Sequence, residues 1–291
     1  MTDVQAATRG GGLRTVRAAA LGGWQRRVHA EQVWTTVVTI DVRGPDLAEA
    51  DVAAVMRSCA EFTHDVDRWL SPFRPDSAIS AISRGELAEV DAPEAVMEVL
   101  DGCRRARDLT GGVFDPWRSG TGGGVDPSGY VKGWAADQMA GMATAAGFGN
   151  VCVNAGGDVV CRGEQAPGQP WAIGVQHPWR RDEVVRVVHV RDGAVATSGR
   201  YERGNHIVDP ARHAGSAQSM GETEGGTRSR LTGGMLDSAT VVGPDGGLAD
   251  ALATALVVAG AYGVRFLADL PEWSAYLVSG GRAQMIGPAF S

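Results

Sequence analysis

The sequence has no excess of positive charge. Its 291 residues include 27 lysine and arginine residues against 34 acidic residues, which gives a formal net charge of -7. A nucleic-acid-binding surface needs a basic face. The charge balance therefore argues against a nucleic acid as a partner.

Cysteine is scarce, and the four cysteines contain no C-x-x-C pair. Cys152 and Cys161 lie in apolar stretches typical of strands, where a cysteine is usually a small buried thiol. We therefore predict neither a metal site nor a disulfide at the cysteines.

The N-terminal region has no long hydrophobic run. Its apolar stretch at residues 16–21 is too short to span a membrane, and no cysteine follows it to accept a lipid. From these absences we expect a flexible arm over residues 1–27, a single domain over residues 28–291, no membrane span and a cytoplasmic location.

The composition is that of a globular protein with a hydrophobic core, because 44% of the residues are hydrophobic and 21% are charged. Predicted helices and strands interleave without a regular βαβ rhythm, which favours an α+β fold with mixed, largely antiparallel sheets flanked by helices. The predicted helices cover residues 47–70, 93–109, 134–146 and 247–256, and the predicted strands residues 33–42, 151–154, 171–175, 184–190, 194–197, 238–242, 273–278 and 283–286. Residues 212–234, polar and without periodicity, predict a mobile loop.

The predicted helix over residues 247–256 carries a carboxylate and a hydroxyl on one face. Asp250 and Thr254 are four residues apart, so their side chains lie one above the other. Their oxygen atoms are suitable ligands for Mg²⁺, which commonly takes one or two carboxylates together with phosphate oxygens and water. The alternative is an amphipathic helix in which Asp250 only favours the positive end of the helix dipole.

Seven short motifs, taken in order, resemble those of the ApbE-type flavin transferases, the FAD:protein FMN transferases. They read FRPDS (73–77), GGVFDP (111–116), VDPSGYVKGWAAD (125–137), NAGGD (154–158), TSGRY (197–201), HIVDP (206–210) and ADALATAL (249–256). The resemblance implies an ApbE-like domain with a site for FAD and Mg²⁺ in a central cleft. It also implies an enzyme that moves FMN from FAD onto a Thr or Ser hydroxyl of an acceptor flavoprotein and releases AMP.

The same resemblance assigns roles to individual residues. It implies that the side chains of Asp250 and Thr254 and the backbone oxygens of Gly129 and Ala253 bind the metal. It implies that Asp250 and His206 are catalytic, with His206 as a general base or phosphate donor. The residues that it places around FAD are Phe73, Phe114, Asp115, Asp126, Lys132, Ser198, His206 and Ile207.

Several of these residues have a plainer interpretation. Lys132 can be a solvated residue at a helix start, His206 can order its own turn, the phenylalanines can belong to the core, and Asp158 can be structural. The chain also departs from the family pattern, since Trp34 stands where glycine is expected and the segment 117–125 is short. Two further functions therefore stay open: Mg²⁺-dependent hydrolysis of FAD to FMN and AMP, and flavin binding without catalysis.

Overall fold

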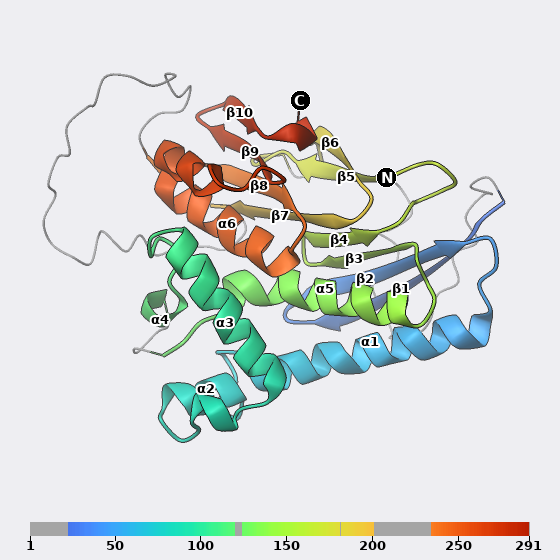
Figure 1. Cartoon of the computed structure of the whole chain (residues 1–291), viewed down its shortest axis with the longest axis horizontal. Coiled ribbons are helices and arrows are strands. Elements are labelled where there is room, and N and C mark those ends of the chain that lie inside the picture. Colours follow the sequence, from blue (N-terminus) through green and yellow to red (C-terminus); the bar gives the residue numbers. More distant parts are fainter. Residues whose placement is uncertain (1–22, 120–123, 181, 201–233, 291) are drawn as a thin grey trace, which may run out of the picture.

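The protein is built around an eight-stranded sheet (Figure 1). The computed structural model describes residues 23–119, 124–180, 182–200 and 234–290. Within these residues every pair of neighbouring strands is antiparallel. The strands of the large sheet, in spatial order, are β1 (Gln25–Val33), β2 (Thr36–Gly44), β3 (Val151–Ala155), β4 (Asp158–Arg162), β7 (Gly193–Gly199), β8 (Ser238–Gly243), β9 (Ser274–Ser279) and β10 (Arg282–Ile286).

Helices cover one face of this sheet. Two of them, α5 (Ser128–Ala145) and α6 (Gly246–Ala259), pack on the strands and on each other, and α1 (Glu49–Leu70) and α3 (Glu94–Leu109) pack outside them (Figure 1). The main hydrophobic core lies between these helices and the sheet. The remaining helical segments are α2 (Ala78–Ser83), η1 (Glu89–Asp91), α4 (Pro116–Ser119), η5 (Gly260–Leu267) and η6 (Pro288–Phe290).

A second layer lies on the opposite face. The two-stranded sheet of β5 (Trp171–Gln176) and β6 (Val184–Val190) packs there, and Trp171, Val188 and Val195 belong to a separate small core. The observed architecture confirms the predicted α+β class with antiparallel sheets flanked by helices.

The central helix α6 forms where the sequence predicts it. The Asp245 carboxylate accepts a hydrogen bond from the backbone N–H of Leu248 at 2.7 Å, which caps the N-terminus of the helix. Gly260, at a φ of 62°, ends it. The helical run Gly246–Leu267 is the one segment among the described residues that is long and apolar enough to cross a membrane, but 61% of its apolar window is buried within the fold. Its composition is therefore explained by its place in the core.

The predicted strand over residues 33–42 is confirmed for residues 36–42, which lie in β2, but its start is wrong because the chain turns there. Trp34 and Thr35 adopt left-handed conformations, with φ of 54° and 58°, and form the two-residue turn between β1 and β2. The β-branched residues on both sides of the turn conceal it in the sequence. The predicted arm over residues 1–27 also ends too late, since β1 begins at Gln25; residues 1–22 lie outside the described part of the chain.

Two further elements differ from the prediction. Helix α5 begins at Ser128 rather than at residue 134, because its early glycines, which suggest a turn, are helical positions: Gly129 packs against side chains and Gly133 against the backbone of Gly246. Strand β4 lies between the predicted strands 151–154 and 171–175 and was not predicted: Gly156 and Gly157 form a tight turn, and Asp158 starts the strand. The predicted mobile loop over residues 212–234 lies outside the described residues except at Gly234.

Candidate functional site

Helices α5 and α6 approach each other closely because both carry glycine at the contact. A Cβ atom on Gly133 would lie 1.9 Å from the carbonyl oxygen of Gly246. One turn earlier, a Cβ atom on Gly129 would lie 3.4 Å from the Thr254 hydroxyl and 3.2 Å from the Phe114 ring. Only glycine permits this approach at Gly133, and it brings the start of α5 alongside the polar face of α6.

Asp137 fixes the N-terminus of α6 against α5. Its carboxylate accepts a hydrogen bond from the backbone N–H of Gly246 and another from Arg162 Nη2 at 2.7 Å. Burial raises the pKa of Asp137, and these two donors oppose that rise. Asp137 is therefore a positioning residue, because it holds the helix on which Asp250 and Thr254 lie.

We expect Asp137→Asn to destabilise the protein by about 1–3 kcal/mol. The single amide oxygen of an asparagine can replace only one of the two carboxylate oxygens, so the amide NH₂ group would face either the Gly246 N–H or the Arg162 guanidinium, donor against donor. Urea unfolding measures the change. The control is Asp101→Asn, where an exposed pair with Arg104 is lost and the expected change is below about 1 kcal/mol. Equal losses in the two variants would contradict the positioning role.

Asp250 is buried beside a lysine. Its side chain is 1% exposed, and the Lys132 ammonium lies 3.3 Å from its carboxylate oxygen. Lys132 also pairs with the buried carboxylate of Asp158 at the start of β4. One cation therefore lies between two carboxylates, which leaves the three side chains with a formal charge of -1. Lys132 is also the single lysine in the 291-residue chain.

Thr254 contributes a hydroxyl group on the same helix as Asp250. Its hydroxyl lies 3.0 Å from the hydroxyl of Ser198 on β7, and the two side chains share a hydrogen bond. This hydrogen bond between Thr254 and Ser198 connects α6 to the sheet through two hydroxyl groups. The helical prediction of one shared face for Asp250 and Thr254 agrees with the position of both residues on α6.

The donor chemistry fits a hard divalent cation. A buried carboxylate and hydroxyl oxygens are ligands that Mg²⁺ accepts, whereas nitrogen and sulfur donors suit softer metals. Within the described ranges, no three His, Cys, Asp or Glu side chains are grouped so as to hold a metal ion. A cation at Asp250 would therefore need backbone, water or ligand oxygens to complete its coordination.

Cys103 lies near the same group and was not predicted. Burial raises the pKa of the Cys103 thiol, and the charges of Asp250 and Asp126 raise it further. Cys103 is fully buried. Its environment places it behind the acidic group as an uncharged thiol.

The structure gives the other predicted site residues specific surroundings. Phe114 is buried against Gly129, which agrees with a core position. Asp115 is buried, pairs with Arg107 at 3.1 Å and accepts from the N–H of Trp117 at 3.1 Å. Asp126 accepts from the N–H of Ser128 at 3.0 Å and so supports the first turn of α5.

Four predicted site residues have no described contact with this group, and two of them lie outside the described residues. Phe73 is 79% exposed in the turn after α1, which excludes a core position for it. Ala253 is fully buried, with its methyl group in the main core. His206 and Ile207 lie outside the residues that the structure describes.

The pairing of Asp158 with Lys132 is the main feature that sequence reasoning missed. Asp158 is 26 positions from Lys132 and was considered only as a structural residue. The hairpin turn at Gly156 and Gly157 was a usable signal, because it fixes where β4 starts.

Comparisons with known proteins agree on one family. A model of the ApbE family matches residues 34–119 and 117–277. A protein of Rhodobacter capsulatus named FAD:protein FMN transferase is 33% identical over 174 residues, covering 57% of this chain and 30% of that protein. One of Vibrio cholerae with the same name is 31% identical over 145 residues, covering 47% and 39%. The chain thus spans well under half the length of these two relatives.

Solved structures share the fold. The flavin transferase ApbE from Vibrio cholerae has a TM-score of 0.71 at 19% identity, covering 92% of this chain and 98% of that one. The ApbE protein from Thermotoga maritima has a TM-score of 0.73 at 23% identity, covering 91% and 98%. At these identities the likeness establishes the fold, including the antiparallel sheet and its flanking helices.

Proposed function

The chain belongs to the ApbE family, and from this premise we propose that it transfers the FMN moiety of FAD to a Thr or Ser hydroxyl of an acceptor protein, with Mg²⁺ and with release of AMP. The observation that carries the proposal is the buried carboxylate of Asp250 beside Lys132, on the same helix as the Thr254 hydroxyl that is hydrogen-bonded to Ser198. The name FAD:protein FMN transferase, which the curated relatives bear, supports the same reaction.

The proposed reaction is a displacement at the flavin-side phosphorus of FAD. The acceptor oxygen forms a new bond to this phosphorus, the bond to the bridging oxygen breaks, and AMP leaves with that oxygen. A proton leaves the acceptor hydroxyl, and His206 is the proposed acceptor of this proton. Such a reaction depends chiefly on positioning and on stabilising charge at the phosphate oxygens.

The residues proposed to hold Mg²⁺ are Asp250 and Thr254 by their side chains and Gly129 and Ala253 by their carbonyls. Bound Mg²⁺ would neutralise charge on the phosphate oxygens. Ser198 holds the Thr254 hydroxyl in place through their shared hydrogen bond. The close approach of Gly129 to the Thr254 hydroxyl supports the assignment of both residues to one site.

Lys132 is proposed to bind the phosphates or the flavin carbonyls of FAD. Its side chain is 21% exposed, whereas the side chains of both carboxylate partners are almost fully buried. Asp158 on one side and Asp250 on the other hold the ammonium at the polar face of α6.

We expect Lys132→Ala to weaken FAD binding about tenfold or more, because a hydrogen bond to a charged group contributes about 1.5–3 kcal/mol. Flavin fluorescence quenching measures the Kd. The control is Arg282→Ala, which removes an exposed cation from the edge strand β10 and should leave the Kd unchanged. An unchanged Kd in Lys132→Ala would remove Lys132 from the FAD site.

The single lysine allows an independent test of the same contact. Reductive methylation with formaldehyde modifies Lys132 and the terminal amine, and peptide mass spectrometry distinguishes the two. Saturating FAD should slow methylation of Lys132 and leave the terminal amine unaffected. Equal rates with and without FAD would place Lys132 away from the bound dinucleotide.

The proposed function is tested by incubating the protein with FAD, MgCl₂ and a candidate acceptor, with EDTA as a control. Transfer should give an acceptor band that is fluorescent in a denaturing gel, together with free AMP, and both should vanish with EDTA. AMP and FMN without a fluorescent acceptor would indicate the FAD pyrophosphatase instead. Bound FAD without AMP would indicate flavin binding without catalysis.

A further inference from the structure

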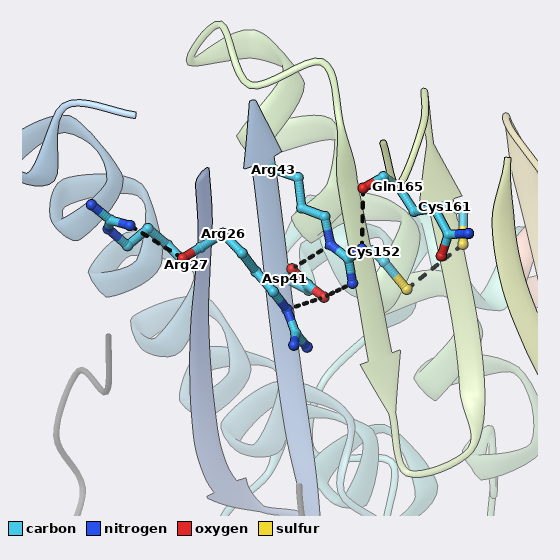
Figure 2. Close-up of polar contacts among 7 residues, drawn as sticks. All are labelled: Arg26, Arg27, Asp41, Arg43, Cys152, Cys161 and Gln165. Carbon is cyan, nitrogen blue, oxygen red and sulfur yellow. Dashed lines mark hydrogen bonds and ion pairs between the residues drawn. The ribbon is translucent and has the colours of Figure 1, made fainter. Parts of the chain in front are cut away.

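The β3–β4 hairpin places two cysteines directly opposite each other. Cys152 and Cys161 are cross-strand partners, and the Cys161 thiol donates to the Cys152 sulfur with the two Sγ atoms 3.7 Å apart (Figure 2). The hairpin turns at Gly156 and Gly157, whose φ angles are 67° and 109°. Two residues with positive φ make a tight turn that fixes the register of the strands. The cysteines are therefore held opposite each other by the hairpin itself.

Their place in the ladder suits a covalent bond. Pairs in an antiparallel ladder alternate between wide and close spacing. Ala155 and Asp158 close the two-residue turn and form a hydrogen-bonded pair, in which the Cα atoms are farther apart. The cysteines are the fourth pair counted from there, so they form a pair without mutual backbone hydrogen bonds, in which the Cα atoms are closer. The two sulfurs must approach to about 2.05 Å to bond. Rotation of the two side chains can supply this movement while the strands stay paired.

Access to the pair is asymmetric. Cys152 is half-buried, whereas Cys161 is fully buried in the small core with Trp171. The other two cysteines, Cys59 and Cys103, are fully buried in the main core. Cys152 is thus the only one of the four cysteines, all of which lie in the described part of the chain, that is not fully buried.

The surroundings of Cys152 carry positive charge. Its cross-strand partner on the other side is Asp41, whose carboxylate is bonded to Arg26 at 3.0 Å and to Arg43 at 2.8 Å (Figure 2). Arg43 is held in place by the Gln165 carbonyl at 3.1 Å. Two guanidinium groups and one carboxylate leave a formal charge of +1 near the thiol, which favours the approach of an anionic reagent.

We propose that Cys152 and Cys161 form a dithiol that a small-molecule disulfide oxidises to an internal disulfide. The Cys152 thiolate attacks the reagent disulfide and expels one reagent thiolate. The Cys161 thiolate then attacks Cys152 Sγ in the mixed disulfide and expels the second. The protein loses two electrons and two protons, and the reagent is reduced to two thiols. The proposed disulfide thus goes beyond the small buried thiols that the sequence predicts, which are free in the structure.

The state of the thiols sets the conditions of the test. Hydrogen bonding to Cys161 and burial raise the pKa of Cys152. Because the thiolate is the nucleophile, the exchange is slow at neutral pH and is best followed at mildly alkaline pH.

The test treats the full chain with oxidised glutathione, blocks the remaining thiols after denaturation, and maps the tryptic peptides by mass spectrometry. In the expected product, a disulfide joins Cys152 to Cys161, no glutathione is retained, and the two other cysteines carry the blocking group. A reductant should restore both thiols fully. In Cys161→Ser, which retains the hairpin, Cys152 should instead keep one glutathione. Four blocked cysteines in the treated native chain, or a lasting glutathione adduct on its Cys152, would overturn the proposal.

Discussion

Asp250→Asn should lower Mg²⁺-dependent release of AMP from FAD by about 100-fold or more, because the amide keeps the shape of the side chain but removes the one carboxylate on the polar face of α6. The fold should persist, since Asp158 still pairs with Lys132 after the change. The rate of AMP release at saturating FAD measures the effect, and far-ultraviolet circular dichroism checks the fold.

The matched control for this variant is Asp269→Asn. Asp269 is an exposed aspartate beyond η5, so its loss should leave AMP release within about twofold of the unmodified protein. If Asp250→Asn retained full activity with the same Mg²⁺ dependence, Asp250 would not be the metal ligand.

Gly133→Ala should destabilise the protein by about 3 kcal/mol or more, because the added methyl group would lie 1.9 Å from the carbonyl oxygen of Gly246. The clash involves backbone on both helices, so no side-chain rotation relieves it. Separation of α5 from α6 would also displace Asp250 from Lys132. The free energy of unfolding in urea measures the first effect, and AMP release measures the second.

The same helix offers the control. Gly141 is exposed on α5, and a Cβ atom there would meet no atom within 4 Å. Gly141→Ala should therefore be neutral or stabilise by about 0.5–1 kcal/mol, the gain expected from helix propensity. If Gly133→Ala were as well tolerated as Gly141→Ala, the close helix contact would not be needed for the fold.

The fold was predictable where periodicity is local. Helices α1, α3 and α6 and the closing hairpin of β9 and β10 lie close to their predicted ranges, because each has a clear apolar pattern with a recognisable end. The prediction failed where tertiary contact overrides local preference. The first turns of α5 have glycines because α6 lies against them, and Trp34 turns the chain although bulky residues disfavour a left-handed φ.

The candidate site was predictable in part for the same reason. The four-residue spacing on one helix was enough to pair Asp250 with Thr254. The pairings of Lys132 with Asp158 and of Thr254 with Ser198 join elements far apart in the chain, and no local pattern encodes them. Residues 201–233, which include His206, lie outside the described structure, so the proposed roles of His206 and Ile207 stay predictions.

The ammonium beside Asp250 has a consequence for the order of events at the site. A cation from solution must compete with Lys132 for that carboxylate, so Mg²⁺ alone should bind weakly. If the phosphates of FAD attract the Lys132 ammonium when FAD binds, the Asp250 carboxylate loses this ion pair and becomes available to Mg²⁺. The dinucleotide and the ion should then each raise the affinity for the other by the same factor, since such coupling is reciprocal. Calorimetric titration of each ligand with the other present measures this cooperativity.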